Sequence, residues 1–522
     1  MNRNALGRSR LGPTYVVVVA SVITWCLTAD ACRNLPAFDT GRHQYSRFIT
    51  YTLEPIPGRS GAEPRTRVTM SVPNHESRPF TIRMPIWTPG EYRVQNHGRN
   101  VQALTARDDT PATIRQLALG VWEVAPADER DVLLTYELPN TRPGIFTENV
   151  DVRTRSAFYD SASVFLYVQD RTDEPVVLRV LPPAGWANAL TPLPQEPDGS
   201  FRADTYEELV DSPILVGERV ERTFMLDNAA HVIAFFGSHR GADYDAYRSA
   251  FRQIVEAGKA YMGGLPYKRY VLFVDMHGRG GGLEHANSAR VALARDAPPR
   301  FSARFLAHEY FHLWNVKRIR PAAMRPMDFG KTPVTRNLWF CEGVTEYVAG
   351  LLTLRAGLVS EEQYFSSIAA LAVAHASMRG RGRITAEEAS LRVWTDGRSS
   401  GYGGVSIYTT GEMIGLCLDL ELLHQTNGQA GFREVFRDLM LRHGPQQPGY
   451  DEDGIRKAVI RTGGAEMGPF YDRLVRTTAE PPLEQCLGYV GLRLDRDGQA
   501  VLPDPHAADA ARRLREIWLY GR

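Results

Sequence analysis

The sequence has little cysteine, almost no net charge and only one apolar run of any length. Its 522 residues include five cysteines, and no group of them has the spacing of a zinc ribbon. The 61 lysines and arginines nearly balance the 60 acidic residues, leaving a formal charge of +1, so the charge does not favour nucleic acid as a partner. No internal repeat or low-complexity segment is present. What remains is an ordinary globular composition, in a chain long enough for roughly two to four domains.

The one apolar run lies near the N-terminus and has the features of a targeting segment. Three arginines among the first ten residues precede YVVVVASVITWCL (15–27), and ADA (29–31) supplies the small residues that a signal peptidase needs. The run is short for a membrane span. We therefore predict a signal peptide over 1–31 and an exported protein, periplasmic or secreted. An uncleaved membrane anchor is the alternative, and lipidation at Cys32 is a weaker one.

Beyond this segment the residue pattern changes twice along the chain. From about 45 to 225, short runs such as TRVTMSV and DVLLTYEL alternate at period two between turn signals, which predicts an all-β domain. Residues 226–360 mix helical and strand patterns, and nearly every segment of 361–480 has helical spacing. A hairpin pattern and a terminal helix follow in a short tail, 481–522. The sequence therefore predicts a multidomain α+β protein.

Four elements are expected in the mixed region. Asp243 is a plausible N-cap for a helix that ends at two glycines, and RYVLFVDM (269–276) reads as a strand. We expect two further helices, over 302–317 and over 339–357. The four cysteines that follow the predicted signal peptide are widely scattered along the chain. We therefore expect them to be mostly buried small side chains, with at most one disulfide bridge in an oxidising compartment.

The stretch HEYFHLWNVKRIRP (308–321) carries two histidines four residues apart, with a glutamate after the first. On a helix, His308 and His312 lie on one face and can direct two imidazole nitrogens at one point. Zinc accepts two histidines and a carboxylate and keeps a fourth position for water. Glu309 would then reach that water as a general base. On these three residues alone, an exposed amphipathic helix that binds nothing is an equal alternative.

A third ligand is available in WFCEGVTEYVAGLLTLRAG (339–357). Glu342 and Glu346 are also four residues apart and so share a helix face. We predict that Glu342 binds the metal, and that Glu346 orients a ligating histidine without binding the metal itself. A solvated acidic face is the alternative, which the apolar residues around both glutamates disfavour. The sequence thus predicts one Zn²⁺ per chain.

The two stretches together resemble the glycyl aminopeptidase family of zinc metallopeptidases. This family is related to the aminopeptidase N group and shares its thermolysin-like catalytic fold. MPIWTPGEY (84–92) is similar to the family's marker in its N-terminal β domain, so the resemblance runs from roughly 45 to 480. It implies a β domain over 45–225, a thermolysin-like zinc metallopeptidase domain over 226–360 and a C-terminal helical domain over 361–480.

The resemblance also implies a binding site for the substrate's N-terminus. GGGLEH (280–285) is similar to a segment that lines the site of related aminopeptidases as an edge strand. A carboxylate there, here Glu284, holds the free α-ammonium group of the substrate. Gly281 and Gly282 beside it would let the substrate backbone approach closely. By itself, this glycine run favours a flexible loop, and the motif helix with its two histidines favours the binding strand instead.

A catalytic tyrosine is implied in the same way. IYTTGEM (407–413) resembles a Tyr-x-Lys-Gly segment, which makes Tyr408 the phenol that hydrogen-bonds the tetrahedral intermediate. Thr410 stands where the family has lysine, Tyr402 is a nearby rival, and a buried structural tyrosine is the alternative. The residues after the second histidine, Trp314, Asn315, Lys317 and Arg320, fit the family pattern as packing and pairing residues. Cys341 is expected to point away from the metal.

These residues predict a zinc-dependent aminopeptidase that hydrolyses the N-terminal peptide bond, and the resemblance implies a preference for glycine or alanine. An endopeptidase of the same fold and a catalytically silent binding protein are the alternatives. Peptides are the expected partners, nucleic acid is not, and a membrane partner is expected only if the N-terminal segment is retained. Family members usually continue into a PDZ domain, for which the tail 481–522 is too short.

Overall fold

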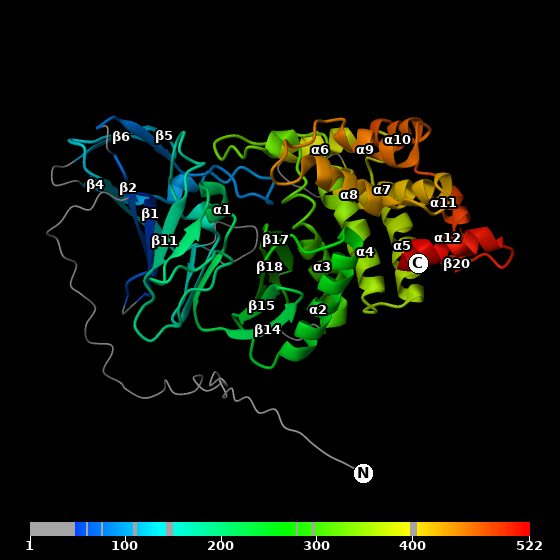
Figure 1. Ribbon diagram of the computed structural model, residues 1–522, viewed down its shortest axis with the longest axis horizontal. Helices are drawn as coiled ribbons and strands as arrows, with labels where there is room; N and C mark the ends of the chain where they lie inside the picture. The colour runs from blue at the N-terminus through cyan, green and yellow to red at the C-terminus, as the bar shows by residue number, and fades with distance from the viewer. Residues whose placement is uncertain are drawn as a thin grey trace, which may run out of the picture. The chain divides into compact units, whose positions relative to one another are not determined.

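The computed structural model describes residues 47–58, 61–74, 77–107, 112–141, 150–277, 280–294, 298–396 and 404–521. The predicted signal peptide (1–31), Cys32 and Tyr402 lie outside these residues. Tyr45–Arg522 forms one compact unit (Figure 1). Among the described helices, none combines the length and the apolar character that a membrane span requires.

The N-terminal part consists of β-sheets, drawn from blue to cyan in Figure 1. Its elements are β1 (Ile49–Ile56), β2 (Arg65–Val72), β3 (Phe80–Arg83), η1 (His97–Asn100), β4 (Gln102–Arg107), β5 (Thr113–Ala118), β6 (Val121–Ala125), β7 (Val132–Pro139), β8 (Val150–Val152), β9 (Ser156–Tyr159), η2 (Ser161–Ser163), β10 (Tyr167–Val168), β11 (Val176–Val180), β12 (Phe201–Ala203), α1 (Tyr206–Val210) and β13 (Ile214–Gly217). Among the described strands, the orders are β12-β11-β1-β2-β7-β4, β10-β3-β6-β5 and β13-β9-β8. In β1 and β2 every second side chain is buried, because successive residues of a strand face opposite sides of the sheet.

A mixed five-stranded sheet follows and supports the candidate site. Its strands are β14 (Val220–Leu226), β15 (Ala229–Phe236), β16 (Arg269–Asp275), β17 (Gly281–Glu284) and β18 (Ser288–Ala292), in the order β14-β15-β16-β18-β17. Helix α2 (Tyr244–Met262) connects the parallel strands β15 and β16. The predicted caps of this helix are confirmed: the Asp243 side chain accepts from the backbone N–H of Ala246, and Gly263 ends the helix with φ 86°.

The rest of the chain is mainly helical, drawn from green to red in Figure 1. Its elements are α3 (Pro299–Phe311), η3 (Ala322–Met324), the π-helix η4 (Trp339–Val344), α4 (Thr345–Arg355), α5 (Glu361–Ala376), α6 (Ala386–Asp396), α7 (Ile407–Gln425), α8 (Phe432–His443), α9 (Gly454–Gly463), α10 (Met467–Arg476), α11 (Leu483–Tyr489), β19 (Leu492–Leu494), β20 (Val501–Pro503) and α12 (Asp509–Tyr520). One buried hydrophobic core joins the five-stranded sheet, these helices and the tail, with Tyr270, Leu351, Leu418 and Trp518 among its members.

The multidomain α+β fold class is confirmed, as are the strand over 269–276 and the hairpin and helix of the tail. The domain boundaries themselves stay a prediction. Cys341, Cys417 and Cys486 are buried and free, as expected of small core side chains.

Two element predictions were wrong in detail. The motif helix ends at Phe311 rather than at 317, because the carbonyl of His312 accepts the backbone N–H groups of both Val316 (3.1 Å) and Lys317 (3.0 Å) and closes a turn there. The helix expected over 339–357 begins as a π-helix and becomes α-helical only at Thr345.

Candidate metal centre

The centre is built on helix α3, which carries both motif histidines on the face that is turned toward α4. His308 and His312 are buried, their rings stand at 88° to each other, and their Nε2 atoms are 2.9 Å apart. The i, i+4 spacing produces this approach, because residues four apart lie one above the other on a helix.

The other ring nitrogen of each histidine faces an oxygen atom, and in His312 it makes a hydrogen bond, whereas Nδ1 of His308 makes none among the described residues. Nδ1 of His312 lies 2.7 Å from the backbone carbonyl of Asn315, so this nitrogen carries the proton and donates. Nδ1 of His308 lies 3.4 Å from Oε1 of Glu346. With the protons on the Nδ1 atoms, both Nε2 atoms are acceptors, and two lone pairs that face each other favour a cation between them.

Glu342 completes a set of three ligand atoms. It is buried in the π-helix η4, and its Oε2 lies 3.6 Å from Nε2 of His308 and 3.5 Å from Nε2 of His312. A tetrahedral zinc ion with ligands at about 2.0–2.1 Å requires its ligand atoms to be roughly 3.3 Å apart. The three separations lie close to that value, so the donor set of these residues fits zinc.

The charges around these atoms favour a cation as well. Burial alone would lower the pKa of His312, but Glu342 and Glu284 outweigh it and raise this pKa to about 10. Burial likewise would raise the pKa of Glu342, whereas the two histidines hold it well below its usual range. The carboxylates therefore stabilise positive charge at the place where the three ligand atoms meet.

Glu309 and Glu284 lie beside the ligands as a second pair of buried carboxylates. One oxygen of Glu309, one oxygen of Glu284 and one ring nitrogen of His312 all lie within 4.8 Å of one another. Burial raises the pKa of Glu309 to about 8, and the nearby Glu284 and Glu342 add to the rise. Glu309 is thus poised to exchange a proton near neutral pH.

One glycine of the edge strand, Gly282, is in direct contact with the Glu309 carboxylate. β17 pairs only with β18 among the described strands and lies against α3. A Cβ at Gly282 would overlap the carboxyl group of Glu309, so only glycine fits opposite this side chain. Gly281, next to it, pairs with Ala292 at the start of the strand. The structure brings Gly282 and Glu284 to the metal centre, and Gly281 precedes them on the same strand.

Tyr408 lies beside the centre, next to His308. It stands in the first turn of α7, after the N-cap Ser406, and its ring centroid is 6.2 Å from that of His308. Four residues later, Glu412 pairs with Arg304 of α3, and Arg304 in turn donates to Glu346 at 3.1 Å. This arrangement ties α7 to the same carboxylate that faces His308.

Residues after the second histidine hold the motif in place. The side chain of Asn315 donates to the carbonyl of Phe340 (2.9 Å) and to Oγ1 of Thr345 (3.1 Å). Lys317 forms a buried ion pair with Asp211 at 2.5 Å. Sγ of Cys341 lies 3.6 Å from the hydroxyl of Tyr450.

One residue of this site is absent from the sequence predictions. The hydroxyl of Tyr92 donates to Oε1 of Glu342 at 2.6 Å, across 250 residues of sequence. Tyr92 is the last residue of the MPIWTPGEY segment. The resemblance of this segment to the family's marker singled it out, but it did not indicate which residue the tyrosine contacts. Gly90 of the same segment lies so close to Glu284 that a Cβ there would be 2.7 Å from both carboxylate oxygens.

Comparison with known proteins points to one group of enzymes. Residues 302–414 match the family model of the M61 glycyl aminopeptidase, and residues 62–218 match that of the peptidase M61 N-terminal domain. No curated protein matches the chain.

Solved structures share the fold. An aminopeptidase N family protein from Idiomarina loihiensis is 23% identical, with a TM-score of 0.79, over 86% of this chain and 79% of that one. An M1 zinc metallopeptidase from Deinococcus radiodurans, in a mutant bound to a Tyr-Ser-Ala substrate, is 15% identical, with a TM-score of 0.51, over 84% and 96%. The same enzyme without the mutation gives a TM-score of 0.51 at 15% identity, over 83% and 94%.

Proposed function

Because the chain belongs to the M61 glycyl aminopeptidase family and is a metallopeptidase, we propose that it is a zinc-dependent aminopeptidase that removes residues from the N-terminus of peptides. The observation that carries the proposal is the convergence of three buried ligand atoms, from His308, His312 and Glu342, next to the carboxylates of Glu309 and Glu284. The M1 neighbours are described as zinc enzymes, which supports zinc as the metal, one per chain.

The metal would supply Lewis acidity at this point, polarising the scissile carbonyl and making water more acidic. The residues of the chain do the rest. Glu309 takes a proton from the attacking water and passes it to the leaving amine, a role that matches its burial and raised pKa. Tyr408 donates its phenol hydrogen to the oxygen on which negative charge develops. The negative charge of Glu346, 3.4 Å from Nδ1 of His308, favours a proton on that nitrogen and so leaves Nε2 free as a ligand.

Glu284 gives the site its preference for a free N-terminus. It is 4% exposed, and its Oε1 has no hydrogen-bond partner among the described residues. A buried carboxylate oxygen of this kind gains most from a charged donor, and the α-ammonium group of a peptide supplies one. Gly281 and Gly282 let the backbone of the first residue lie against β17. The family's description as glycyl aminopeptidase supports glycine, and alanine after it, as the preferred first residue.

We further propose that the protein acts on peptides outside the cytoplasm, since the first 31 residues have the pattern of a signal peptide. The substrate found with the Deinococcus radiodurans enzyme is a tripeptide, which supports short peptides as substrates.

The test is hydrolysis of glycyl- and alanyl-p-nitroanilide by the zinc-loaded protein, with and without a chelator. We expect release that stops on chelation and returns with zinc, and no cleavage of peptides whose N-terminus is acetylated. Cleavage of acetylated peptides would show an endopeptidase instead. No turnover of any peptide, with zinc bound, would show a silent binding protein.

The matched variant is Glu309→Gln, which keeps the size of the side chain and removes its basicity. We expect it to bind zinc as the unmodified protein does and to lose about 10²- to 10⁴-fold in kcat, because proton transfer is its only role. Metal content by elemental analysis and steady-state rates measure the two separately. Retained turnover would rule out Glu309 as the base.

A further inference from the structure

A side chain of the N-terminal β domain bonds to a ligand of the metal centre. Tyr92 is buried, and its hydroxyl donates to Oε1 of Glu342 over 2.6 Å. The other oxygen, Oε2, faces Nε2 of both histidines. The two oxygens of this carboxylate thus have different partners. Oε1 bonds to a tyrosine of the β domain, and Oε2 faces the two histidines of the motif.

The segment that carries Tyr92 is held rigidly. The backbone N–H of Thr88 donates to Oε1 of Gln95 (3.0 Å), and Oγ1 of Thr88 bonds to Nε2 of the buried His97 (3.0 Å). Nε1 of Trp87 donates to the carbonyl of Asp328 (3.2 Å). Backbone bonds from Glu91 to Thr88 close the turn between these residues. With several polar contacts made inside one short segment, the phenol at its end has little freedom to move.

Helix α6 connects this segment to the π-helix. Trp394 of α6 packs edge-on against both Trp87 and Tyr92, with ring centroids 5.5 and 6.0 Å apart. On the same helix, Oγ of Ser390 accepts the backbone N–H of Trp339, the first residue of the π-helix, at 3.0 Å. Both partners of the Tyr92–Glu342 hydrogen bond are therefore positioned by one helix.

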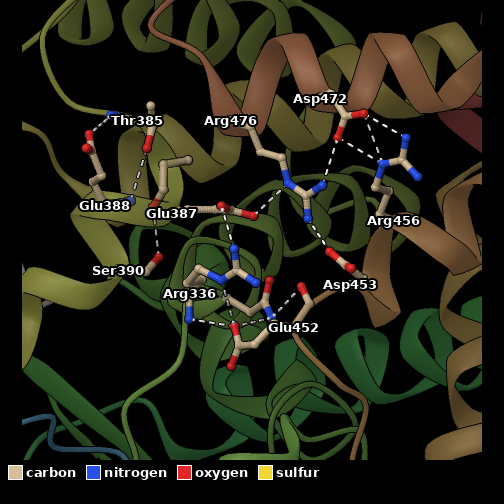
Figure 2. A network of polar contacts seen from close by, with 12 residues as sticks. Arg336, Thr385, Glu387, Glu388, Ser390, Glu452, Asp453, Arg456, Asp472 and Arg476 are labelled. Carbon is tan, nitrogen blue, oxygen red and sulfur yellow. Dashed lines mark hydrogen bonds and ion pairs between the residues drawn. The ribbon is translucent and has the colours of Figure 1, made fainter.

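An ion-pair network fixes α6 in turn (Figure 2). Glu387 of α6 pairs with Arg476 of α10 at 3.0 Å and with Arg336, just before the π-helix, at 3.4 Å. The backbone N–H of Arg336 donates to Glu452 at 2.8 Å. The chain entering the π-helix and helix α6 are thus tied together by Glu387.

We propose that Tyr92 is a positioning residue for the metal ligand Glu342, so that the N-terminal β domain completes the metal centre. By holding Oε1, the phenol fixes the rotation of the carboxylate and leaves Oε2 as its single ligand atom. Hydrogen-bond partners of metal ligands raise affinity in this way, and losing one costs about 10- to 100-fold in metal binding. This inference rests on the proposed function, because it takes Glu342 as a zinc ligand.

The test is Tyr92→Phe, which removes one hydroxyl and keeps the ring against Trp394. Tyr51→Phe is the matched control: its hydroxyl is also buried and donates over 2.7 Å, but to the carbonyl of Leu166 in the β-sheets. Zinc affinity is measured by competition with a chromophoric chelator, using the full chain freed of metal. We expect Tyr92→Phe to bind zinc about 10- to 100-fold more weakly and Tyr51→Phe to bind it as the unmodified protein does.

The visible absorption of the cobalt-substituted protein gives a second readout that a merely structural role would not move. A carboxylate that changes from one ligand oxygen to two alters the coordination of cobalt, so we expect a changed spectrum for Tyr92→Phe and an unchanged one for Tyr51→Phe. Equal affinity and equal spectra in the two variants would overturn the inference while leaving the zinc site in place. If the unmodified protein itself fails to bind zinc, the proposed function fails, and the inference with it.

Discussion

At the scale of single residues, His97 shows how the segment near the metal centre responds to acid. Its ring is fully buried, Nε2 bonds to Thr88, and Nδ1 has no partner among the described residues. Burial, together with the charges of Arg99 and Arg93, lowers its pKa from 6.5 to about 3. The folded protein therefore keeps His97 neutral down to about pH 3, whereas the unfolded chain protonates it near pH 6.5.

This difference makes stability depend on pH. Between the two pKa values the unfolded state binds more protons than the folded state, so the free energy of unfolding falls as pH falls. From pH 7 to pH 4.5 we expect His97 alone to remove about 2.5 kcal/mol. Urea unfolding of the unmodified protein and of His97→Gln at both pH values measures this. The variant should lose about 2.5 kcal/mol less on acidification, and equal losses in the two proteins would contradict the expectation.

At the scale of helices and strands, local sequence predicted most of what the structure contains. The boundaries of α2 could be predicted from local residues, since Asp243 caps the first turn and Gly263 ends the helix in the left-handed conformation. The end of the motif helix is different, because the turn after Phe311 contains Asn315, whose side chain bonds to Phe340 of η4 and Thr345 of α4. Such a partner cannot be read from the local pattern.

The π-helical conformation of η4 likewise accompanies a contact between distant segments. Gly343 in η4 and Gly411 in α7 lie so close that a Cβ on either would overlap the backbone of the other helix. The extra residue per turn in η4 lets the two helices meet here. Glu342 precedes one of these glycines and Tyr408 lies three residues before the other, so the crossing sets the distance between ligand and phenol.

We expect Gly411→Ala to disturb this crossing. The new methyl group would overlap the carbonyl of Trp339, which we expect to cost about 1–3 kcal/mol in stability and about 10- to 100-fold in kcat/KM. The matched control is Gly488→Ala in α11, where a Cβ meets no atom within 4 Å and alanine favours the helix by up to about 1 kcal/mol. Thermal unfolding and p-nitroanilide hydrolysis report both effects. Activity that survives Gly411→Ala would show that the site tolerates a shift of α7.

At the scale of the whole molecule, contacts between side chains could be predicted from the sequence only where the residues are close in the chain or belong to a recognised motif. His308 and His312 follow from the i, i+4 rule, and Glu342 from a second motif. Tyr92 could not be predicted in this way, since it reaches Glu342 across 250 residues. A contact of this kind depends on how the β domain packs against the helices, which no local pattern encodes.

The same packing depends on Asp211, which directly follows α1 of the N-terminal part. Its carboxylate pairs with Lys317 at 2.5 Å and accepts the backbone N–H of Ala286 at 2.8 Å. Burial alone would raise the pKa of Asp211, but Lys317 and His285 hold it well below its usual range. One side chain thus joins the N-terminal part to the turn after the motif helix and to the segment that follows Glu284.

Replacing Asp211 by Asn would leave the Lys317 ammonium group buried without its counter-charge. Breaking a buried pair by removing one partner costs about 3–5 kcal/mol, so we expect a loss of that size in the free energy of unfolding. The control is Asp227→Asn, whose pair with Lys259 lies on the surface and contributes at most about 1 kcal/mol. Because the single oxygen of Asn cannot accept from both Lys317 and Ala286, the Ala286 contact is weakened too, and hydrogen exchange should speed up over residues 281–290 in Asp211→Asn and stay unchanged in Asp227→Asn. If the two variants were equally stable and equally protected there, Asp211 would not be what holds the β domain against the metal centre.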